Sequence, residues 1–580
     1  MRSSRLRHLV SLLGPYRGRV ILMLVSLVLA TGAALVPPYL AGRAIDDGIR
    51  DSDTSALTVI LVVFVVAALI NWAATYAQTY LINWVGQRAL QDLRIELFEH
   101  LQRLSVGFYS RNKAGVLISR LTNDVQALDQ LVTEGISTLF SATLTLVGTG
   151  VILVLLDLEL ALITFLTFPV LLAGSVAFRL ASSGAYRLTR EKIAAVTAYL
   201  QETLSGVRVV RAFGQEPRHK SRFAELNDEH RRVNMRTVYL NAAYFPSVEL
   251  LTAVATAAIL LYGGNQVLDG DSAVTIGVLA SFVFYLQSFF DPIQSLSQLY
   301  TTYQAGMAAL DKIFELLDED PDLVDKPGAV ELPRIRGEIE FDDVTFAYSG
   351  DNPALCSVDL HIPPGQTVAL VGATGAGKST LAKLVARFYD PDHGRVLVDG
   401  YDLRDVTQHS LRSQLGIVPQ EGFLFSGTIG ENIAFGRPGA TDEEVRAAAA
   451  AVGAHEFIDR LPDGYDTGVG ERGGHLSAGQ RQLVAFARAA AADPRILILD
   501  EATSNVDVRT EAQIERGLRR LLAGRTALVI AHRLSTIRGA GRIVVLDRSR
   551  IVEQGTHEEL LDADGAYARL YRDWARQSVA

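Results

Sequence analysis

The stretch from Gly372 to Thr380 reads Gly-Ala-Thr-Gly-Ala-Gly-Lys-Ser-Thr and decides the fold of the second half of the chain. It matches the pattern G-x-x-x-x-G-K-[ST], with a strand-like run at 368–371 before it and a helix-like run at 381–388 after it. The glycines let backbone N–H groups wrap phosphates, and the lysine reaches the β- and γ-phosphates. The pattern therefore predicts a nucleotide-binding loop formed by Gly372, Gly375, Gly377, Lys378, Ser379 and Thr380.

A second acidic element, Ile496-Leu-Ile-Leu-Asp500-Glu501, lies further along the chain. Its four apolar residues predict a buried strand, so Asp500 should emerge at the carboxyl end, where α/β sheets bind ligands. There Asp500 can hold Mg²⁺ together with the Ser379 hydroxyl. Glu501 is suited to orient and polarise an attacking water. An apolar run that ends in Asp-Glu is common, and this one gains its weight from the phosphate loop upstream.

Strand-like and helix-like segments alternate around these motifs. The strand-like runs lie at 338–348, 367–371, 394–399, 416–419, 496–499, 526–531 and 542–554. Apolar, β-branched runs that lead into helices predict an α/β domain with a largely parallel sheet. Upstream, the stretches around Pro321 and around Pro327-Gly328 break helical periodicity. We therefore expect this domain at 337–580, preceded by a linker at 321–336.

The first 320 residues contain six apolar runs long enough to cross a bilayer as helices. They lie at about 19–41, 57–82, 136–156, 159–179, 238–263 and 274–300. Their interruptions are mostly Gly, Pro, Ser, Thr, Asn and Gln, which buried membrane helices tolerate. Helices of soluble proteins are seldom so long or so uniformly apolar. Residues 1–320 are thus predicted to form an all-α transmembrane domain of six helices.

The charges of the loops predict the orientation in the membrane. The N-terminal segment, the stretch between the second and third runs, and the stretch between the fourth and fifth runs are rich in Lys and Arg. The other connections are short and acidic or neutral. Both termini, both long loops and the α/β domain should therefore face the cytoplasm, in a multi-pass protein of the cell membrane. A retained first helix is favoured over a cleaved signal peptide, because five further spans follow.

The composition of the whole chain excludes several classes of protein. Residues 1–320 hold 26 Lys and Arg against 27 Asp and Glu, and the remaining 260 hold 29 against 37. A nucleic-acid-binding protein would carry a basic domain, which neither part does. The 49% hydrophobic content excludes a disordered chain, and the lone Cys356 excludes a disulfide scaffold.

The two long cytoplasmic loops have helical periodicity, and each breaks near its middle. The breaks lie at 105–115 and 213–217. Such tips could dock on a cytoplasmic domain, or they could be solvated turns. Within the sixth span, polar residues recur at helical spacing and share one face, which favours a face that lines a water-filled cavity over one that bonds to another helix. These residues are Gln287, Asp291, Gln294 and Gln298.

The motif Leu476-Ser477-Ala478-Gly479-Gln480, just before the second acidic element, resembles the signature of ATP-binding-cassette (ABC) transporters. The resemblance covers essentially the whole chain: six spans followed by one ATPase domain look like an exporter-type half-transporter of the lipid and multidrug class. Residues 207–216 (VRVVRAFGQE) also resemble the second cytoplasmic loop of that class, which docks on the opposite ATPase domain.

The resemblance implies a role for further residues. Tyr348 would stack on adenine, and Gln420 would touch Mg²⁺ or water. Ser477 and Gly479 of the signature, which Gln480 completes, would contact the γ-phosphate of ATP bound to the other subunit. His532 would hydrogen-bond the γ-phosphate, and Asp507 would bridge the two ATP sites. The implied cofactors are ATP and Mg²⁺.

Two features depart from the family pattern. Ala478 replaces the usual glycine of the signature, which is tolerable if its φ is negative. Asn505-Val506 replaces the common Ala-Leu before Asp507. Glu501, which inactive partners in asymmetric heterodimers typically lack, is present. The resemblance therefore implies an active subunit of a homodimer or of a heterodimer with a second half-transporter.

The expected function is ATP-driven export of a lipid, a drug-like molecule or another amphiphile by alternating access. An importer half with an exporter-type fold, for example for a metal chelate, remains an alternative. So does an ATP-regulated channel or membrane regulator, which the intact Glu501 disfavours. No residue pattern identifies the transported substrate.

Overall fold

The computed structural model describes residue 11 and residues 13–269, 274–350, 352–420, 422–500, 508–531 and 534–577. The chain divides into two compact units. The first comprises Met1–Gln102 and Ala114–Glu319, and the second comprises Arg103–Lys113 and Asp320–Ala580.

Within its described residues, the first unit consists of helices joined by short turns, and six of its helical stretches are long and apolar enough to cross a membrane. The six predicted spans are thereby confirmed. The long helices are α2 (Arg17–Arg43), α3 (Thr54–Arg103), α7 (Ile136–Leu156), α8 (Leu158–Leu166), α9 (Phe168–Ser205), α11 (Glu216–Asp269) and α12 (Ile276–Leu317). Short helical segments join them: η1 (Gly14–Tyr16), η2 (Ala44–Arg50), α5 (Ala114–Ser119), η3 (Arg120–Asp124), α6 (Val125–Asp129), η4 (Gln130–Gly135) and α10 (Val207–Ala212).

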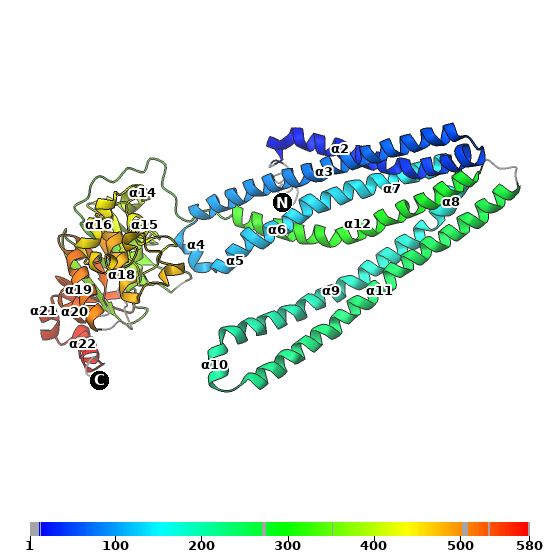
Figure 1. The fold of residues 1–580 in the computed structure, drawn as a ribbon. Helices are drawn as coiled ribbons and strands as arrows, with labels where there is room; N and C mark the ends of the chain where they lie inside the picture. Colours follow the sequence, from blue (N-terminus) through cyan, green and yellow to red (C-terminus); the bar gives the residue numbers. More distant parts are fainter. Residues whose placement is uncertain are drawn as a thin grey trace. The chain divides into compact units, whose positions relative to one another are not determined.

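One predicted span is divided. The run at 159–179 ends as α8 and resumes as α9, because Pro169 stands in the first turn of α9 and lacks the N–H that would continue the helix. In Figure 1, α9 and α11 run side by side, joined through α10, and their α10 end diverges from α3, α7 and α12. The tip of this hairpin presents Phe213 with 75% of its surface exposed.

The polar face expected in the sixth span is only partly as predicted. Gln287 and Asp291 on α12 have exposed side chains, and Gln294 is half-buried; the side chain of Gln298 lies outside the described residues. Their aromatic neighbours mostly turn the other way: Phe282, Tyr285 and Phe289 pack in a buried cluster with α7, α8 and α11. Only Phe284 of that set is exposed, because the four rings do not share one helical face.

The second unit contains two sheets, and its main sheet has the order β10-β9-β3-β8-β7-β6. All its pairings are parallel except that of β9 with β10, so the prediction of a largely parallel sheet is confirmed. Its strands are β3 (Thr367–Gly372), β6 (Leu415–Val418), β7 (Ile496–Asp500), β8 (Thr526–Ile530), β9 (Arg542–Asp547) and β10 (Arg550–Gly555). An antiparallel sheet of order β2-β1-β4-β5 comprises β1 (Ile339–Phe346), β2 (Leu355–Ile362), β4 (His393–Val398) and β5 (Tyr401–Asp402).

Two clusters of apolar residues bury the main sheet on both faces. Val368 and Leu370 point toward the antiparallel sheet and α13, whereas Ala369 and Val371 point toward α16, α18 and α19. The helices of this unit are α4 (Val106–Arg111), α13 (Lys378–Val385), α14 (Gln408–Arg412), α15 (Ile429–Ala434), α16 (Asp442–Ala451), α17 (His455–Ile458), α18 (Ala478–Ala491), α19 (Val508–Leu522), α20 (Leu534–Arg538), α21 (His557–Asp562) and α22 (Ala566–Gln577), with the 3₁₀ turns η5 (Leu403–Asp405), η6 (Gly464–Asp466) and η7 (Glu471–Gly473).

The tip of the first long loop, predicted to break at 105–115, belongs to this second unit. Ser105 caps α4 and also donates to Asp322 at 3.0 Å, and Arg111 pairs with the same carboxylate at 2.9 Å. The Ser110 hydroxyl lies 3.4 Å from the Tyr389 hydroxyl. The first predicted tip therefore docks rather than forming a solvated turn.

Candidate nucleotide-binding site

The phosphate loop joins β3 to α13 at the carboxyl edge of the main sheet, and its backbone requires glycine. Gly372 and Gly377 have φ of 150° and 106°, where other residues are strained. A Cβ at Gly372 would lie 2.2 Å from the carbonyl oxygen of Leu546, and one at Gly377 would lie 2.7 Å from that of Ala354. Gly375, with φ of 84°, has open space beside it. The loop is thus closely packed against Leu546 and Ala354, and it is open beside Gly375, where a ligand can approach.

Lys378 begins α13 and folds back over this loop. Its Nζ donates to the carbonyl oxygens of Gly372 at 2.7 Å and Ala373 at 2.9 Å, and only 7% of the residue is exposed. Burial lowers the pKa of Lys378, with the Asp500 carboxylate acting in the opposite direction. Among the described residues no carboxylate forms an ion pair with Lys378. A buried ammonium held only by carbonyl oxygens fits a site for an anion such as a phosphate.

Tyr348 and Thr380 are held together beside the loop. The Tyr348 hydroxyl lies 3.1 Å from Thr380 Oγ1, and Lys383 Nζ lies 5.0 Å from the centre of the Tyr348 ring. Thr380 is buried and Ser379 half-buried, whereas Tyr348 is 41% exposed. The tyrosine therefore offers an accessible ring at the site, and the buried Thr380 hydroxyl positions it.

Asp500 and Gln420 lie at the same edge of the main sheet. Asp500 ends β7 and pairs with Ile530 of β8, which in turn pairs with Leu370 of β3. Asp500 is thus level with the end of β3 and two strands away, at about 10 Å. Gln420 is exposed and follows β6, the neighbour of β7. The sheet brings both to the side where the phosphate loop opens. Glu501, Asp507, His532 and the departure at Asn505-Val506 lie outside the described residues.

The signature motif forms the start of α18. The Ser477 side chain accepts from the N–H of Gln480, and the Gln480 side chain accepts from the N–H of Ser477, which closes a capping box. Ser477 is exposed and Gly479 is buried. Ala478 is the first helical residue and is not among the residues of positive φ, so the methyl group that departs from the family pattern fits.

Tyr389 is a neighbour of this site that the sequence did not indicate. Its ring centre lies 5.2 Å from that of Tyr348 and 5.3 Å from that of Phe346. A Cβ at Gly107 of the docked tip would lie 3.1 Å from Tyr389 Cε1. Tyr389 thus touches both the tip of the first loop and the ring beside the phosphate loop. No pattern in the sequence links residues so far apart in the chain.

Comparison with known families adds to this geometry. The family model described as "ABC transporter transmembrane region" matches residues 20–293, and the one described as "ABC transporter" matches residues 355–504. The second match contains the phosphate loop, the signature and Asp500.

Individual relatives match over almost the whole chain. An ATP-dependent lipid A-core flippase of Syntrophus aciditrophicus is 40% identical over 98% of this chain and 94% of its own length. A multidrug efflux ATP-binding/permease protein of Mycobacterium bovis is 40% identical over 97% of this chain, which spans only 47% of that relative. The solved structure of a bacterial Atm1-family ABC exporter with ATP bound superposes with a TM-score of 0.79 at 34% identity, and the match covers 97% of this chain and 98% of that one.

Proposed function

This chain belongs to the ABC transporter family, and from that premise we propose that it is one half of an exporter that uses ATP hydrolysis to move an amphiphile out of the cytoplasm. One observation carries this function: a buried lysine with only carbonyl partners sits in a phosphate loop, on the same chain as six membrane-length helices. The α/β unit and both termini are then cytoplasmic.

ATP binding follows from the groups that surround the loop. Lys378 exchanges its two carbonyl partners for phosphate oxygens, and the N–H groups of the loop donate to the same phosphates. The exposed ring of Tyr348 stacks on adenine. Ser379, Asp500 and Gln420 supply the hard oxygen ligands that Mg²⁺ prefers, and bound Mg²⁺ would neutralise developing phosphate charge.

Hydrolysis requires a proton acceptor for water at the γ-phosphate. Glu501 directly follows the end of β7 and is proposed to accept that proton as the water attacks. His532 follows β8, the strand between β3 and β7, and is proposed to donate to the γ-phosphate. Asp507 is proposed to bridge two ATP sites.

Three observations support a dimer. Ser477 caps an exposed helix start, and the resemblance places this group against ATP bound to another subunit. The tip of the α9–α11 hairpin leaves Phe213 exposed, as expected of a tip that docks on the partner's ATPase domain. The multidrug relative is about twice as long as this chain, as a protein that joins two such halves would be. A homodimer and a pair with a second half-transporter both satisfy these features.

The relatives favour export of an amphiphile over import. One is a lipid flippase by name and one a multidrug efflux protein, and the matched structure is an exporter. The exposed Gln287 and Asp291 of α12 are the groups proposed to line the transport pathway. Whether the substrate is a lipid or a drug-like molecule is decided by a panel of substrates tested for stimulation of ATPase activity.

Glu501→Gln tests the proposed chemistry. The amide keeps the shape of the side chain but cannot accept a proton, so we expect ATP binding to persist and turnover to fall by about 100-fold or more. ATP binding is measured with a fluorescent analogue and turnover by phosphate release. Unchanged hydrolysis would contradict the role of Glu501. In inside-out vesicles, ATP-dependent accumulation of substrate supports export, whereas loss from preloaded vesicles would indicate import and ATP-insensitive flux a channel.

A further inference from the structure

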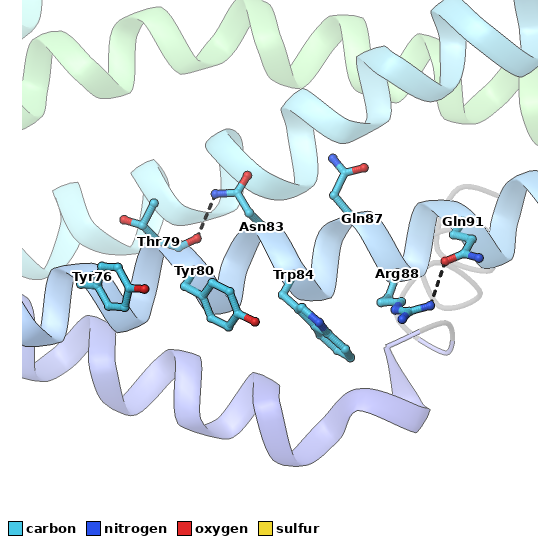
Figure 2. A pocket seen from close by; sticks show the side chains of 8 residues that line it. All are labelled: Tyr76, Thr79, Tyr80, Asn83, Trp84, Gln87, Arg88 and Gln91. Carbon is cyan, nitrogen blue, oxygen red and sulfur yellow. Dashed lines mark hydrogen bonds between the residues drawn. The ribbon is translucent and has the colours of Figure 1, made fainter.

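A groove of about 530 Å³ follows one face of α3 where its apolar run ends (Figure 2). Figure 2 shows Tyr76, Tyr80, Trp84 and Arg88 projecting to the same side of the helix, toward α2. Tyr76 and Tyr80 are 68% and 58% exposed. The lining residues are Tyr76, Thr79, Tyr80, Asn83, Trp84, Gln87, Arg88 and Gln91.

Two arginines meet at Trp84 in this groove. The Arg19 guanidinium carbon, from α2, lies 3.4 Å from the centre of the Trp84 ring, and that of Arg88 lies 5.6 Å from the same centre. Asp92, one turn beyond Arg88 on α3, accepts from the Tyr16 hydroxyl at 2.8 Å. Among the described residues neither arginine forms an ion pair, and Arg88 donates only to the amide oxygen of Gln91. Both guanidinium groups therefore keep N–H donors for an anion.

The position of the groove on the helix specifies the kind of anion. The apolar run of the second span ends near residue 82, and Trp and Tyr side chains concentrate at the headgroup level of a bilayer. Leu69 and Trp72 precede the groove on α3 and lie nearer the middle of the span, and both have exposed, largely apolar side chains. Arginine binds phosphodiesters in a planar fork, and an acyl chain covers an apolar helix face. A free phosphate would satisfy only the two arginines.

We propose that this groove binds an anionic phospholipid of the cytoplasmic leaflet, with its phosphate between Arg19 and Arg88 and its chains along α3 beside Tyr76 and Tyr80. The lipid would join the start of α2 to the middle of α3. This ligand is distinct from the transported substrate, and its binding requires neither ATP nor transport.

Fluorescence of Trp84 reports occupancy directly. The chain has three tryptophans, so Trp72→Phe with Trp574→Phe leaves Trp84 as the only one. The full-length protein is reconstituted in phosphatidylcholine vesicles that contain either brominated phosphatidylglycerol or brominated phosphatidylcholine as the quencher. We expect the anionic lipid to quench Trp84 more strongly. Each of Arg19→Gln and Arg88→Gln should reduce that preference by about fivefold.

Arg94→Gln is the matched control, because Arg94 is exposed on α3 but outside the groove. It should keep the preference for the anionic lipid, and retained ATP binding shows that each variant is folded. Equal quenching by the two lipids would overturn the proposal. So would an absence of quenching, as when a second copy covers the groove, or an Arg94 effect as large as that of Arg19. Displacement of the lipid by inorganic phosphate would instead identify a site for a free anion.

Discussion

At the scale of single residues, Lys378 is placed for phosphate binding, and the burial of its charge destabilises the folded protein. Burial lowers the pKa of this lysine. The folded protein therefore binds its proton less tightly than the unfolded chain does, and the charged form destabilises the fold at neutral pH. This destabilisation disappears as the pH rises above the ordinary lysine value of about 10.4.

Lys378→Met should consequently have two opposite effects on thermal unfolding. It should raise the Tm of the nucleotide-free protein by about 2–4 °C, since it removes a buried charge, and the gain should shrink as the pH approaches that of lysine titration. It should also abolish the rise in Tm that ATP causes in the wild type. Lys113→Met, which removes an exposed lysine in the same unit, should change neither quantity. If the nucleotide-free variant had a lower Tm than the nucleotide-free wild type, the inference that the buried charge of Lys378 destabilises the fold would be wrong.

The sequence predicted the other residues of this site only where they belong to a local sequence motif. The glycines at 372 and 377 stand out because the loop needs positive φ and close packing, which the motif encodes. Thr380 was predicted to bind the nucleotide, and the structure shows its hydroxyl bonded to Tyr348. Tyr389 was missed, because its contacts with Tyr348 and with the tip at Gly107 depend on tertiary packing.

At the scale of elements, the start of α18 combines a helix cap with a proposed ATP contact, and the two roles can be separated. Ser477→Ala should destabilise the protein by about 1 kcal/mol through loss of the cap and should also reduce ATPase activity strongly. Thr441 caps α16 with the same box, formed with Glu444, away from the signature. Thr441→Ala should cost similar stability and leave ATPase activity unchanged. ATPase activity and urea unfolding are measured for both variants. If both variants lose ATPase activity equally, Ser477 has only a structural role.

Strand and helix boundaries were predictable where hydrophobic pattern alone decides them. The third span is found where it was predicted, at 136–156, because a continuous apolar run leaves no alternative. The run at 542–554 was predicted as one strand, but it is a hairpin that turns at Arg548 and Ser549, both with positive φ. Asp547 and Ser549 are common in turns, but the Gly or Asn that usually marks two consecutive positive φ angles is absent, so the sequence carried only a weak signal for the turn. β2 was also missed, although its residues alternate between buried and exposed positions, as is typical of a strand with one buried face.

At the scale of the whole molecule, the sequence predicts the two-part plan, and it leaves open whether each loop tip docks or forms a solvated turn. Apolar runs and a phosphate loop are local signals, so the sequence alone distinguishes the membrane part from the α/β part. The structure instead groups Arg103–Lys113 with the second unit, through Asp322 and Tyr389. The sequence of the short helix α4 gives no sign of its partner, and the exposed Phe213 at the other tip has no partner among the described residues.

The proposed dimer makes a prediction that a single chain cannot satisfy. If each ATP site combines Glu501 of one subunit with Ser477 of the other, dimers of Glu501→Gln alone or of Ser477→Ala alone contain no intact site. A mixed dimer contains one site with both defects and one with none, because the two-fold axis exchanges the contributing surfaces. Co-expression of the two variants with different affinity tags, followed by purification through both, should therefore restore about half of the wild-type ATPase activity per dimer.

The control for this experiment is the double variant that carries both substitutions, paired with the wild type through the same tags. In that dimer each of the two sites receives one defect, so activity should stay low although the composition of substitutions is identical. Low activity in the first preparation together with about half of the wild-type activity in this control would show that Glu501 and Ser477 act on the same chain's nucleotide. Failure to recover any doubly tagged dimer would point to a different half-transporter as the natural partner, since the chain would then not pair with itself.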